Sequence, residues 1–331
     1  MMTELFYPAD GAVVSQLTPK QKHFMRSRNQ WGDLSDRVPV GESPIDHSLP
    51  EPVRFSWRTG EEDALFTLWE CKDDGTRSII FEQCGGSEAQ IYNLKTGVTY
   101  CWRVGQSEVR WFTTEDAVPR LLYVDGISNV RDLGGYRTDD GYRVRQGMLI
   151  RGTESDLRLS ITEEGKRTMR EVLGIRTELD LRYPEDVRDR TVSVLGDDIQ
   201  YIHISIHAYK KLFSYGTELC RIFDVLSDDR NYPVYFHCYG GADRTGLLAM
   251  LIEALLGVSE YDIRLDYEMT TCSLFGIRSY ETAYMAEFLD ELNRYPGDTF
   301  RDRIHSFLHC CGISDATINK VKMLLLTKGD N

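Results

Sequence analysis

One stretch in the C-terminal half decides how this chain is interpreted, because it joins an apolar strand to an apolar helix through a short glycine-containing loop. It reads Val234-Tyr-Phe-His237-Cys238-Tyr239-Gly240-Gly241-Ala242-Asp243-Arg244-Thr245-Gly246. The residues before His237 have the length and character of a buried strand, and residues 246–256 form an apolar run that ends at Gly257. The stretch therefore predicts a strand, a loop and the start of a helix.

The loop between Cys238 and Arg244 has the composition of an anion-binding site. Glycines relax the steric limits on the backbone, so successive N–H groups can turn inward. The helix that begins beside Arg244 adds the positive end of its dipole. The sequence therefore predicts a cup for a dianionic phosphate, with substrate-binding contributions from Tyr239, Gly240, Gly241, Ala242 and Gly246.

Cys238 is the candidate nucleophile in this cup. Thiols beside a cation or a helix N-terminus can have pKa values of about 3.5–7.5 instead of about 8.5, and the thiolate is the reactive form. Arg244 can offer a two-pronged hydrogen bond to phosphoryl oxygens, Thr245 can place a hydroxyl near the sulfur, and His237 can support the loop. A single cysteine is more often a packing residue, but this combination of residues favours catalysis.

The same stretch resembles the HCxxGxxR[ST] loop of the protein tyrosine phosphatase superfamily, and HCYGGADRTG is similar to a bacterial branch whose loop reads HCxxGKDRTG. The resemblance extends over about residues 121–326, from the Asn129-Val-Arg131-Asp132 segment to the Cys311-Gly-Ile-Ser-Asp315 segment. It implies an α/β domain with a central sheet flanked by helices. It also implies hydrolysis of phosphomonoesters through a phosphocysteine intermediate, without metal or cofactor.

The proton donor is assigned by the same resemblance to Asp243, the loop residue beside Arg244. Asp180 is the alternative, either as the donor or as a partner that orients Arg244. Asp186 and Glu185, on the turn that follows, are further candidates. A positioned acid typically contributes about 10²–10⁴-fold to such a reaction.

The substrate is predicted to be a phosphotyrosine protein, with phosphoinositides as the alternative. Ala242 stands where the bacterial branch with the HCxxGKDRTG loop has a lysine. In that branch the lysine is associated with binding the extra phosphates of inositol lipids. A catalytically inactive module that binds phosphoproteins is a third interpretation. The sequence gives no indication of oligomeric state.

Several side chains near the loop have open roles at this stage. Arg131 and Asp132 are expected to form a buried ion pair behind the loop. Arg151 and Arg182 could either extend the anion pocket or pair with carboxylates. Tyr239 could stack on an aromatic substrate or point outward, and residues 201–215 are a candidate lid.

The N-terminal part predicts an all-β, immunoglobulin-like sandwich, because short apolar runs recur between Gly and Asp clusters. Residues 94–104 resemble the tyrosine corner of fibronectin type III domains, with Tyr100 as the tyrosine. Residues 18–49 fit this pattern poorly and are expected to form a helical turn and a polar loop. The domains are therefore predicted at 1–117 and 118–331, with the change near Pro119.

Bulk properties restrict the cellular context. The net charge of −13 and the lack of a basic run argue against a nucleic-acid partner. The sequence contains no apolar run long enough to cross a bilayer and no signal peptide, so a cytoplasmic location is expected. Eight cysteines without a CxxC pair favour reduced thiols.

His305 and His309 stand four residues apart, and Cys310 and Cys311 follow them, which is a spacing that can bind zinc. No second pair of ligands is recognisable in the sequence, so packing is the preferred interpretation and no metal is predicted.

Overall fold

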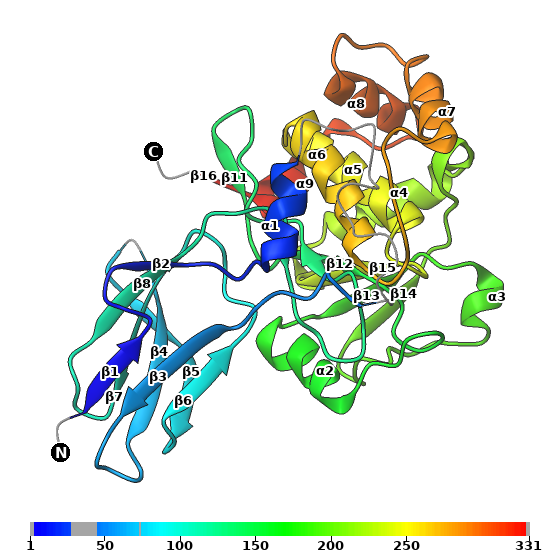
Figure 1. Ribbon diagram of the computed structural model, residues 1–331. Coiled ribbons are helices and arrows are strands. Elements are labelled where there is room, and N and C mark those ends of the chain that lie inside the picture. Colours follow the sequence, from blue (N-terminus) through cyan, green and yellow to red (C-terminus); the bar gives the residue numbers. More distant parts are fainter. Residues whose placement is uncertain (1–2, 28–44, 73, 329–331) are drawn as a thin grey trace. The chain divides into compact units, whose positions relative to one another are not determined.

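The computed structural model describes residues 3–27, 45–72 and 74–328, and the contacts divide the chain into two units (Figure 1). The first unit contains residues 1–18 and 50–118, and the second contains residues 19–49 and 119–331. This division differs from the predicted one in residues 19–49, which the sequence analysis assigned to the first domain.

Residues 19–49 belong with the second unit because of contacts that no sequence pattern shows. Helix α1 (Pro19–Arg26) carries Gln21, whose side-chain amide donates hydrogen bonds to the carbonyls of His47 and Leu49, both at 2.8 Å. The Ser48 hydroxyl then accepts a hydrogen bond of 2.9 Å from the backbone N–H of Asn129. Most of the predicted polar loop, residues 28–44, lies outside the described residues.

The first unit consists of two sheets. One has the strand order β1-β3-β6 and the other the order β2-β8-β7-β4-β5. The pairing is antiparallel except between β2 and β8, so the larger sheet is mixed. The strands are β1 (Glu4–Tyr7), β2 (Ala12–Val14), β3 (Val53–Arg58), β4 (Leu65–Cys71), β5 (Arg77–Cys84), β6 (Glu88–Ile91), β7 (Thr99–Val104) and β8 (Arg110–Thr114).

Both sheets of the first unit contribute to one aromatic core. Trp57 on β3 stacks on Phe66 of β4 with ring centroids 5.0 Å apart, and Phe55 meets Trp102 edge-on at 5.3 Å. The alternation of buried and exposed residues along β3 is what a strand with one inward face requires. The Tyr100 hydroxyl accepts a hydrogen bond of 2.9 Å from the backbone N–H five residues earlier.

The second unit is built on a six-stranded sheet with the order β14-β13-β15-β12-β10-β9. The four strands β14, β13, β15 and β12 are parallel, and β10 and β9 add antiparallel pairings at one edge. Every residue of β13, β15 and β12 is buried, as expected for parallel strands covered on both faces. The strands are β9 (Arg120–Leu121), β10 (Arg131–Asp132), β12 (Leu149–Gly152), β13 (Thr177–Asp180), β14 (Gln200–His203) and β15 (Val234–His237).

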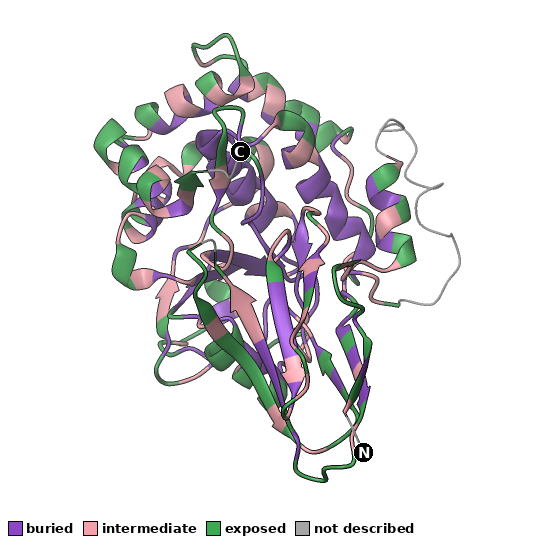
Figure 2. Ribbon diagram, turned by 90° about the vertical axis from the view of Figure 1, so that its left-hand side faces the viewer, coloured by how far each residue is buried: buried purple, intermediate pink, exposed green. Residues whose placement is uncertain are grey.

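Helices cover the two faces of this sheet, with α2 on one side and α4 and α5 on the other (Figure 1). Helix α5 is apolar and buried over most of its circumference, whereas α7, α8 and α9 alternate buried and exposed positions (Figure 2). The helices are α2 (Glu163–Arg167, continued by the π-turn η1, Thr168–Val172), α3 (Pro184–Val187), α4 (Gly216–Leu226), α5 (Asp243–Leu256), α6 (Glu260–Met269), α7 (Ala283–Leu292), α8 (Phe300–Cys310) and α9 (Asp315–Leu325).

Shorter elements complete the second unit. Strands β11 (Tyr142–Val144) and β16 (Leu326–Lys328) form a separate antiparallel pair. Among the described residues, 3₁₀ turns follow β14, α4 and α6 in the chain: η2 (Tyr209–Ser214), η3 (Asp229–Asn231) and η4 (Thr270–Cys272). Among the described residues, every helix is too short or too polar to span a lipid bilayer.

The register of the parallel strands determines where a site can form. His237, the last residue of β15, pairs with Asp180 at the end of β13 and with Gly152 at the end of β12. The carboxyl ends of three central strands therefore meet at one edge, and the loop that begins with Cys238 leaves the sheet there. Sites in open α/β sheets lie at such edges.

Candidate active site

Cys238 is the first residue of the loop between β15 and α5, and only 3% of its surface is exposed. Burial by itself raises the pKa of the Cys238 thiol. The charge of Arg244 and the nearby hydroxyl and backbone N–H of Thr245 outweigh that effect, while Asp243 opposes them as the smallest influence. The pKa of Cys238 is lowered from its ordinary value, which favours the nucleophilic thiolate.

The Thr245 hydroxyl is placed to act on this sulfur. It is fully buried and has no hydrogen-bond partner among the described residues. The hydroxyl is therefore free to turn toward the Cys238 sulfur, and its proximity helps to lower the pKa of the thiol.

The two loop glycines are required for different reasons. Gly241 has a φ of +61°, and a Cβ there would lie 2.3 Å from the carbonyl oxygen of Gly152. A Cβ on Gly240 would lie 2.8 Å from the ring of Phe275. Ala242 is buried and directly precedes α5.

Gly246 was predicted to bind substrate, and the structure places it elsewhere. Its backbone N–H donates a hydrogen bond of 2.8 Å to the Ala242 carbonyl inside the helix, so this amide is not available to an anion. A Cβ at Gly246 would lie 2.9 Å from the Tyr267 ring. Close packing against α6 explains the glycine.

The loop carbonyls are held on the outside of the loop. The Asn129 side-chain amide donates to the carbonyls of Gly240 and Gly241 at 3.0 and 3.2 Å, and Arg151 donates to Gly241 at 2.8 Å. Because the peptide group is planar and trans, its N–H points opposite to its C=O. Fixing these carbonyls outward turns the N–H groups of Gly241 and Ala242 toward the inside of the loop.

A buried ion-pair cluster stands behind this arrangement. Arg131 donates to the Asp266 carboxylate at 2.6 Å, Arg151 pairs with the other oxygen of that carboxylate, and Arg131 also donates to the Asn129 side chain at 2.5 Å. These three charged side chains are at most 1% exposed. Asp266, on α6, therefore positions both arginines that support the loop.

The expected ion pair between Arg131 and Asp132 is wrong. The two residues are neighbours on strand β10, and successive side chains of a strand point to opposite faces. Asp132 instead pairs with Arg120 at 2.6 Å and accepts the backbone N–H of Gly147 at 2.6 Å.

Arg244 differs from the other arginines near the loop. Its Nη1 lies 3.4 Å from the Leu181 carbonyl and its guanidinium carbon 4.2 Å from the centre of the Tyr183 ring. No carboxylate of the described residues lies within ion-pair distance of it. Arg151 and Arg182, whose roles were open, are fully buried and paired with carboxylates. Of these three arginines, Arg244 is thus the one that remains available to an anion in the loop.

His237 connects the loop to the sheet. Its Nδ1 donates to the Cys238 carbonyl at 3.1 Å, and its Nε2 lies 2.9 Å from the Glu178 carboxylate. Burial lowers the pKa of His237, but the carboxylates of Asp180 and Glu178 outweigh that effect and raise the pKa above its ordinary value. A protonated imidazole, a donor at both nitrogens, fits these contacts.

Glu178 is a supporting residue that the sequence analysis missed. It lies inside the fully buried strand β13, where an acid in a run of buried positions is a signal that could have identified it. Both of its oxygens accept from Arg190 at 2.7 Å, and Ser193 donates at 2.5 Å.

Asp180 does not fit the role of proton donor. It is fully buried, and its oxygens accept hydrogen bonds from Arg182 at 2.7–3.0 Å and from Tyr201 at 3.0 Å. Burial raises the pKa of Asp180, but His237 and Arg182 hold it far below the usual range. Its close partner is Arg182, so the expected orientation of Arg244 by Asp180 is not observed.

Asp243 lies in the first turn of α5, next to Arg244, and its side chain is 34% exposed. Its Oδ1 accepts from Tyr209 at 2.5 Å and from Nε of Arg278 at 2.9 Å, and its Oδ2 accepts from the same guanidinium at 3.2 Å. Tyr209 lies within the predicted lid segment, whereas Arg278 was missed. Glu185 and Asp186 lie on α3 beyond Tyr183.

Aromatic and basic side chains surround the loop. Tyr183 hydrogen-bonds to His207 at 2.9 Å, and Tyr239 meets Phe275 edge-on with ring centroids 6.3 Å apart. The guanidinium of Arg158 lies 4.9 Å over the Tyr239 ring. Tyr239 is therefore half-buried between two neighbours instead of pointing freely outward.

Comparison with known proteins agrees with this geometry. Residues 122–327 match the model of the tyrosine phosphatase family, and the chain therefore belongs to that family. This segment is a phosphatase domain, of the class of phosphoric monoester hydrolases. A Cupriavidus necator protein assigned as a tyrosine-protein phosphatase is 28% identical over 171 residues, which cover 44% of this chain and 61% of that protein.

Two solved structures are also similar to the chain. The core catalytic domain of the Saccharomyces cerevisiae PP-IP phosphatase SIW14, in complex with citrate, has 17% identity and a TM-score of 0.33 and covers 52% of this chain and 93% of its own. PTPMT1 in complex with PI(5)P has 12% identity and a TM-score of 0.31, covering 50% of this chain and 97% of its own.

Proposed function

We propose that this chain is a cysteine-dependent phosphomonoesterase that acts through a phosphocysteine intermediate. The observation that carries the proposal is Cys238 itself, buried at the start of the loop with its pKa lowered by Arg244 and Thr245. The Cys238 thiolate attacks phosphorus, the P–O bond to the alcohol breaks, and a proton passes to the leaving oxygen. Water then attacks phosphorus, the P–S bond breaks, and phosphate and the thiolate are released.

Three side chains assist these steps in the proposal. Arg244 binds two phosphoryl oxygens and stabilises the charge that spreads over them in the transition state. Thr245 donates a hydrogen bond to the departing sulfur in the second step. Asp243 protonates the leaving group and then accepts a proton from water, after exchanging one of its present partners, Arg278 or Tyr209, for the reacting oxygen.

The proposed substrate is a phosphotyrosine protein. Aromatic surface near the loop, which could bind a phosphotyrosine ring, is offered by Tyr183, Tyr239 and Phe275. Ala242 stands where the bacterial branch with the HCxxGKDRTG loop has a lysine associated with inositol lipids. Phosphoinositides are an equally supported alternative, because Arg158 is exposed beside Tyr239 and Arg278 lies beside Asp243. Both cations could bind further phosphates.

The test compares purified wild-type protein with Cys238→Ser and Asp243→Asn on three substrates: p-nitrophenyl phosphate, a phosphotyrosine peptide and a short-chain inositol phospholipid. Cys238→Ser should have no turnover. Asp243→Asn should lose about 10²–10⁴-fold on the peptide but less on p-nitrophenyl phosphate, whose leaving group needs less protonation. Tight binding of phosphopeptide by the wild type without phosphate release would support the inactive module instead.

Two further assignments belong to the proposal. The first unit is proposed to be an immunoglobulin-like domain, supported by its two sheets, their shared core and the Tyr100 hydrogen bond. A reducing, cytoplasmic location is proposed because the mechanism needs a free thiol, and all eight cysteines are free.

A further inference from the structure

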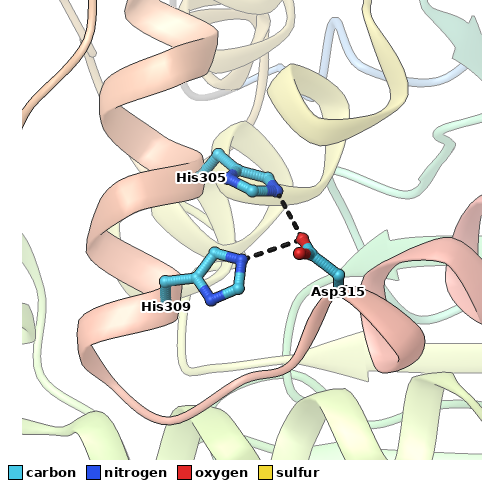
Figure 3. Close-up of side chains that lie close together, drawn as sticks. All are labelled: His305, His309 and Asp315. Atoms are coloured by element: carbon cyan, nitrogen blue, oxygen red, sulfur yellow. Dashed lines mark hydrogen bonds and ion pairs between the residues drawn. The ribbon is translucent and has the colours of Figure 1, made fainter.

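Two histidines and an aspartate converge at the junction of α8 and α9, away from the loop of Cys238. His305 and His309 are one helical turn apart on α8, with ring centroids 4.6 Å apart. Their Nε2 atoms lie 3.1 and 2.8 Å from the same oxygen, Oδ1 of Asp315 (Figure 3). Asp315 is the first residue of α9, which follows α8 after a short turn.

His305 is half-buried, and His309 and Asp315 are exposed. The exposed fractions are 38% for His305, 39% for His309 and 66% for Asp315. The sequence analysis preferred packing for the histidines over a metal site, and it did not anticipate the partial exposure of both side chains. It also missed the third partner, because Asp315 reads along the chain as an ordinary acid after the Ser314 helix cap.

The three potential ligand atoms all lie within 4.8 Å of one another. Bond lengths of about 2.0–2.1 Å around a tetrahedral zinc ion place neighbouring ligand atoms about 3.3 Å apart. The observed separations of 2.8 and 3.1 Å are a few tenths of an ångström shorter, because the imidazoles now contact Oδ1 directly, and a bound ion would replace these two contacts. We propose that His305, His309 and Asp315 bind a divalent transition-metal ion of the zinc class, with water in the fourth position.

The chemistry of the ligands agrees with this choice. Two imidazoles and one carboxylate suit zinc, cobalt or nickel, whereas magnesium and calcium prefer oxygen ligands only. The hydrogen bond from His309, followed by the charges of His309 and His305, lowers the pKa of Asp315 against the opposing effect of burial. Lys322, farther along α9, interacts with Asp315 only weakly. Its pKa is lowered mainly by its own burial and by the charge of Arg301, and the charge of Asp315 is the smallest of the effects on it.

Another three-residue group of similar composition does not support a second site. Glu178, Asp180 and His237 also bring ligand atoms together, but they are fully buried. Each of those carboxylates is already paired with an arginine, Arg190 or Arg182. The cluster at α8 and α9 is accessible and lacks such a partner among the described residues, which makes it the better candidate.

The experiment is a titration of the full chain with Co²⁺ and Zn²⁺, followed by calorimetry and by the visible spectrum of the cobalt form. All samples carry Cys238→Ser, because the thiolate of the loop could itself bind metal. We expect one equivalent of tightly bound metal, a spectrum of tetrahedral cobalt without sulfur charge-transfer absorption, and a higher melting temperature in the presence of Zn²⁺.

Single variants identify the ligands. His305→Ala, His309→Ala and Asp315→Asn should each weaken binding by about tenfold or more, since even loss of a supporting group costs 10–100-fold. His23→Ala, at an exposed histidine of α1, is the matched control and should bind as the parent does. The proposal is overturned if the parent binds no metal, if the three variants bind normally, or if Cys310→Ser removes the binding. None of these three readouts depends on phosphatase activity.

Discussion

The reactivity of Cys238 is determined by opposing effects on one thiol. Burial disfavours the thiolate, and a nearby carboxylate on Asp243 does the same. Among the groups that lower the pKa of Cys238, Arg244 has the largest effect and Thr245 the next. The charge of Arg244, which has no carboxylate partner among the described residues, is therefore the main reason why the pKa of this cysteine is lowered, whereas the pKa of the other buried cysteines is raised. The pKa of Cys272, by contrast, is raised to about 12 by burial.

The first prediction concerns Arg244→Ala. Removing the guanidinium should raise the pKa of Cys238, so the thiolate should persist to a lower pH in the wild type than in the variant. The measurement is the rate of Cys238 alkylation by iodoacetamide between pH 5 and 9, read by mass spectrometry. Arg244→Lys, which keeps the charge but not the planar fork, should retain the low midpoint and lose turnover. An unchanged midpoint in Arg244→Ala would contradict this account.

The second prediction concerns Tyr183, whose ring lies 4.2 Å from the Arg244 guanidinium carbon. Tyr183→Leu removes a cation–π contact worth about 0.5–2 kcal/mol, so kcat should fall between about twofold and thirtyfold. Tyr183→Phe keeps the ring and loses only the hydrogen bond to His207, so it should stay close to the wild type.

A double-mutant cycle separates positioning of Arg244 from a general loss of stability. In an Arg244→Lys background, Tyr183→Leu should have little further effect on kcat, because the guanidinium group that the Tyr183 ring contacts is already absent. If the fold-losses of kcat caused by the two substitutions multiply in the double variant, Tyr183 does not act through Arg244.

At the scale of elements, the loop depends on strand β12 and on Asn129, which precedes β10. Gly152 ends β12, and its carbonyl occupies the space that a Cβ on Gly241 would need. Asn129 and Arg151 then fix the loop carbonyls from the same side. The shape of the anion cup is therefore determined by β12 and its neighbours as much as by the loop itself.

The third prediction compares Gly241→Ala with Gly174→Ala. Both glycines have similar positive φ angles, +61° and +65°, but a Cβ at Gly174 would meet nothing within 4 Å. Gly174→Ala should cost about 1 kcal/mol of unfolding free energy from backbone strain alone. Gly241→Ala should cost more and should also abolish turnover of p-nitrophenyl phosphate. Equal losses in urea unfolding, with activity retained, would show that the loop tolerates the side chain.

The local order of strand, loop and helix could be predicted from the sequence because it depends on neighbouring residues. The predicted helix of residues 246–256 lies within α5, which begins three residues earlier at Asp243. The supporting charges could not be predicted in the same way. Asp266 lies 135 residues from Arg131, Glu178 lies 59 from His237, and nothing along the chain marks these pairs.

One error was avoidable from the sequence alone. Arg131 and Asp132 are adjacent on a strand, and the period of two already directs their side chains to opposite faces. The assignment of the proton donor is different, because Asp180 and Asp243 can be separated only by their surroundings. Asp180 is enclosed by Arg182 and Tyr201, whereas Asp243 is partly exposed.

At the scale of the whole chain, an early segment supports a loop that comes almost two hundred residues later in the sequence. The Ser48 hydroxyl accepts from the backbone N–H of Asn129, and the Asn129 side chain holds the carbonyls of Gly240 and Gly241. Asn129 has a φ of +58°, so its backbone is already in a sparsely populated region and depends on such contacts. A fragment that begins at residue 119 would lack this support.

The fourth prediction is that Ser48→Ala in the full chain lowers both stability and turnover. It removes the acceptor of a buried N–H, which costs about 1–3 kcal/mol, and loosens Asn129 behind the loop. Ser27→Ala is the matched control, since the Ser27 hydroxyl, just after α1, donates an exposed hydrogen bond to the His23 carbonyl at 2.8 Å. Urea unfolding and kcat are measured for both. If Ser48→Ala lowers stability but leaves kcat unchanged, residues 45–49 stabilise the second unit without positioning its loop.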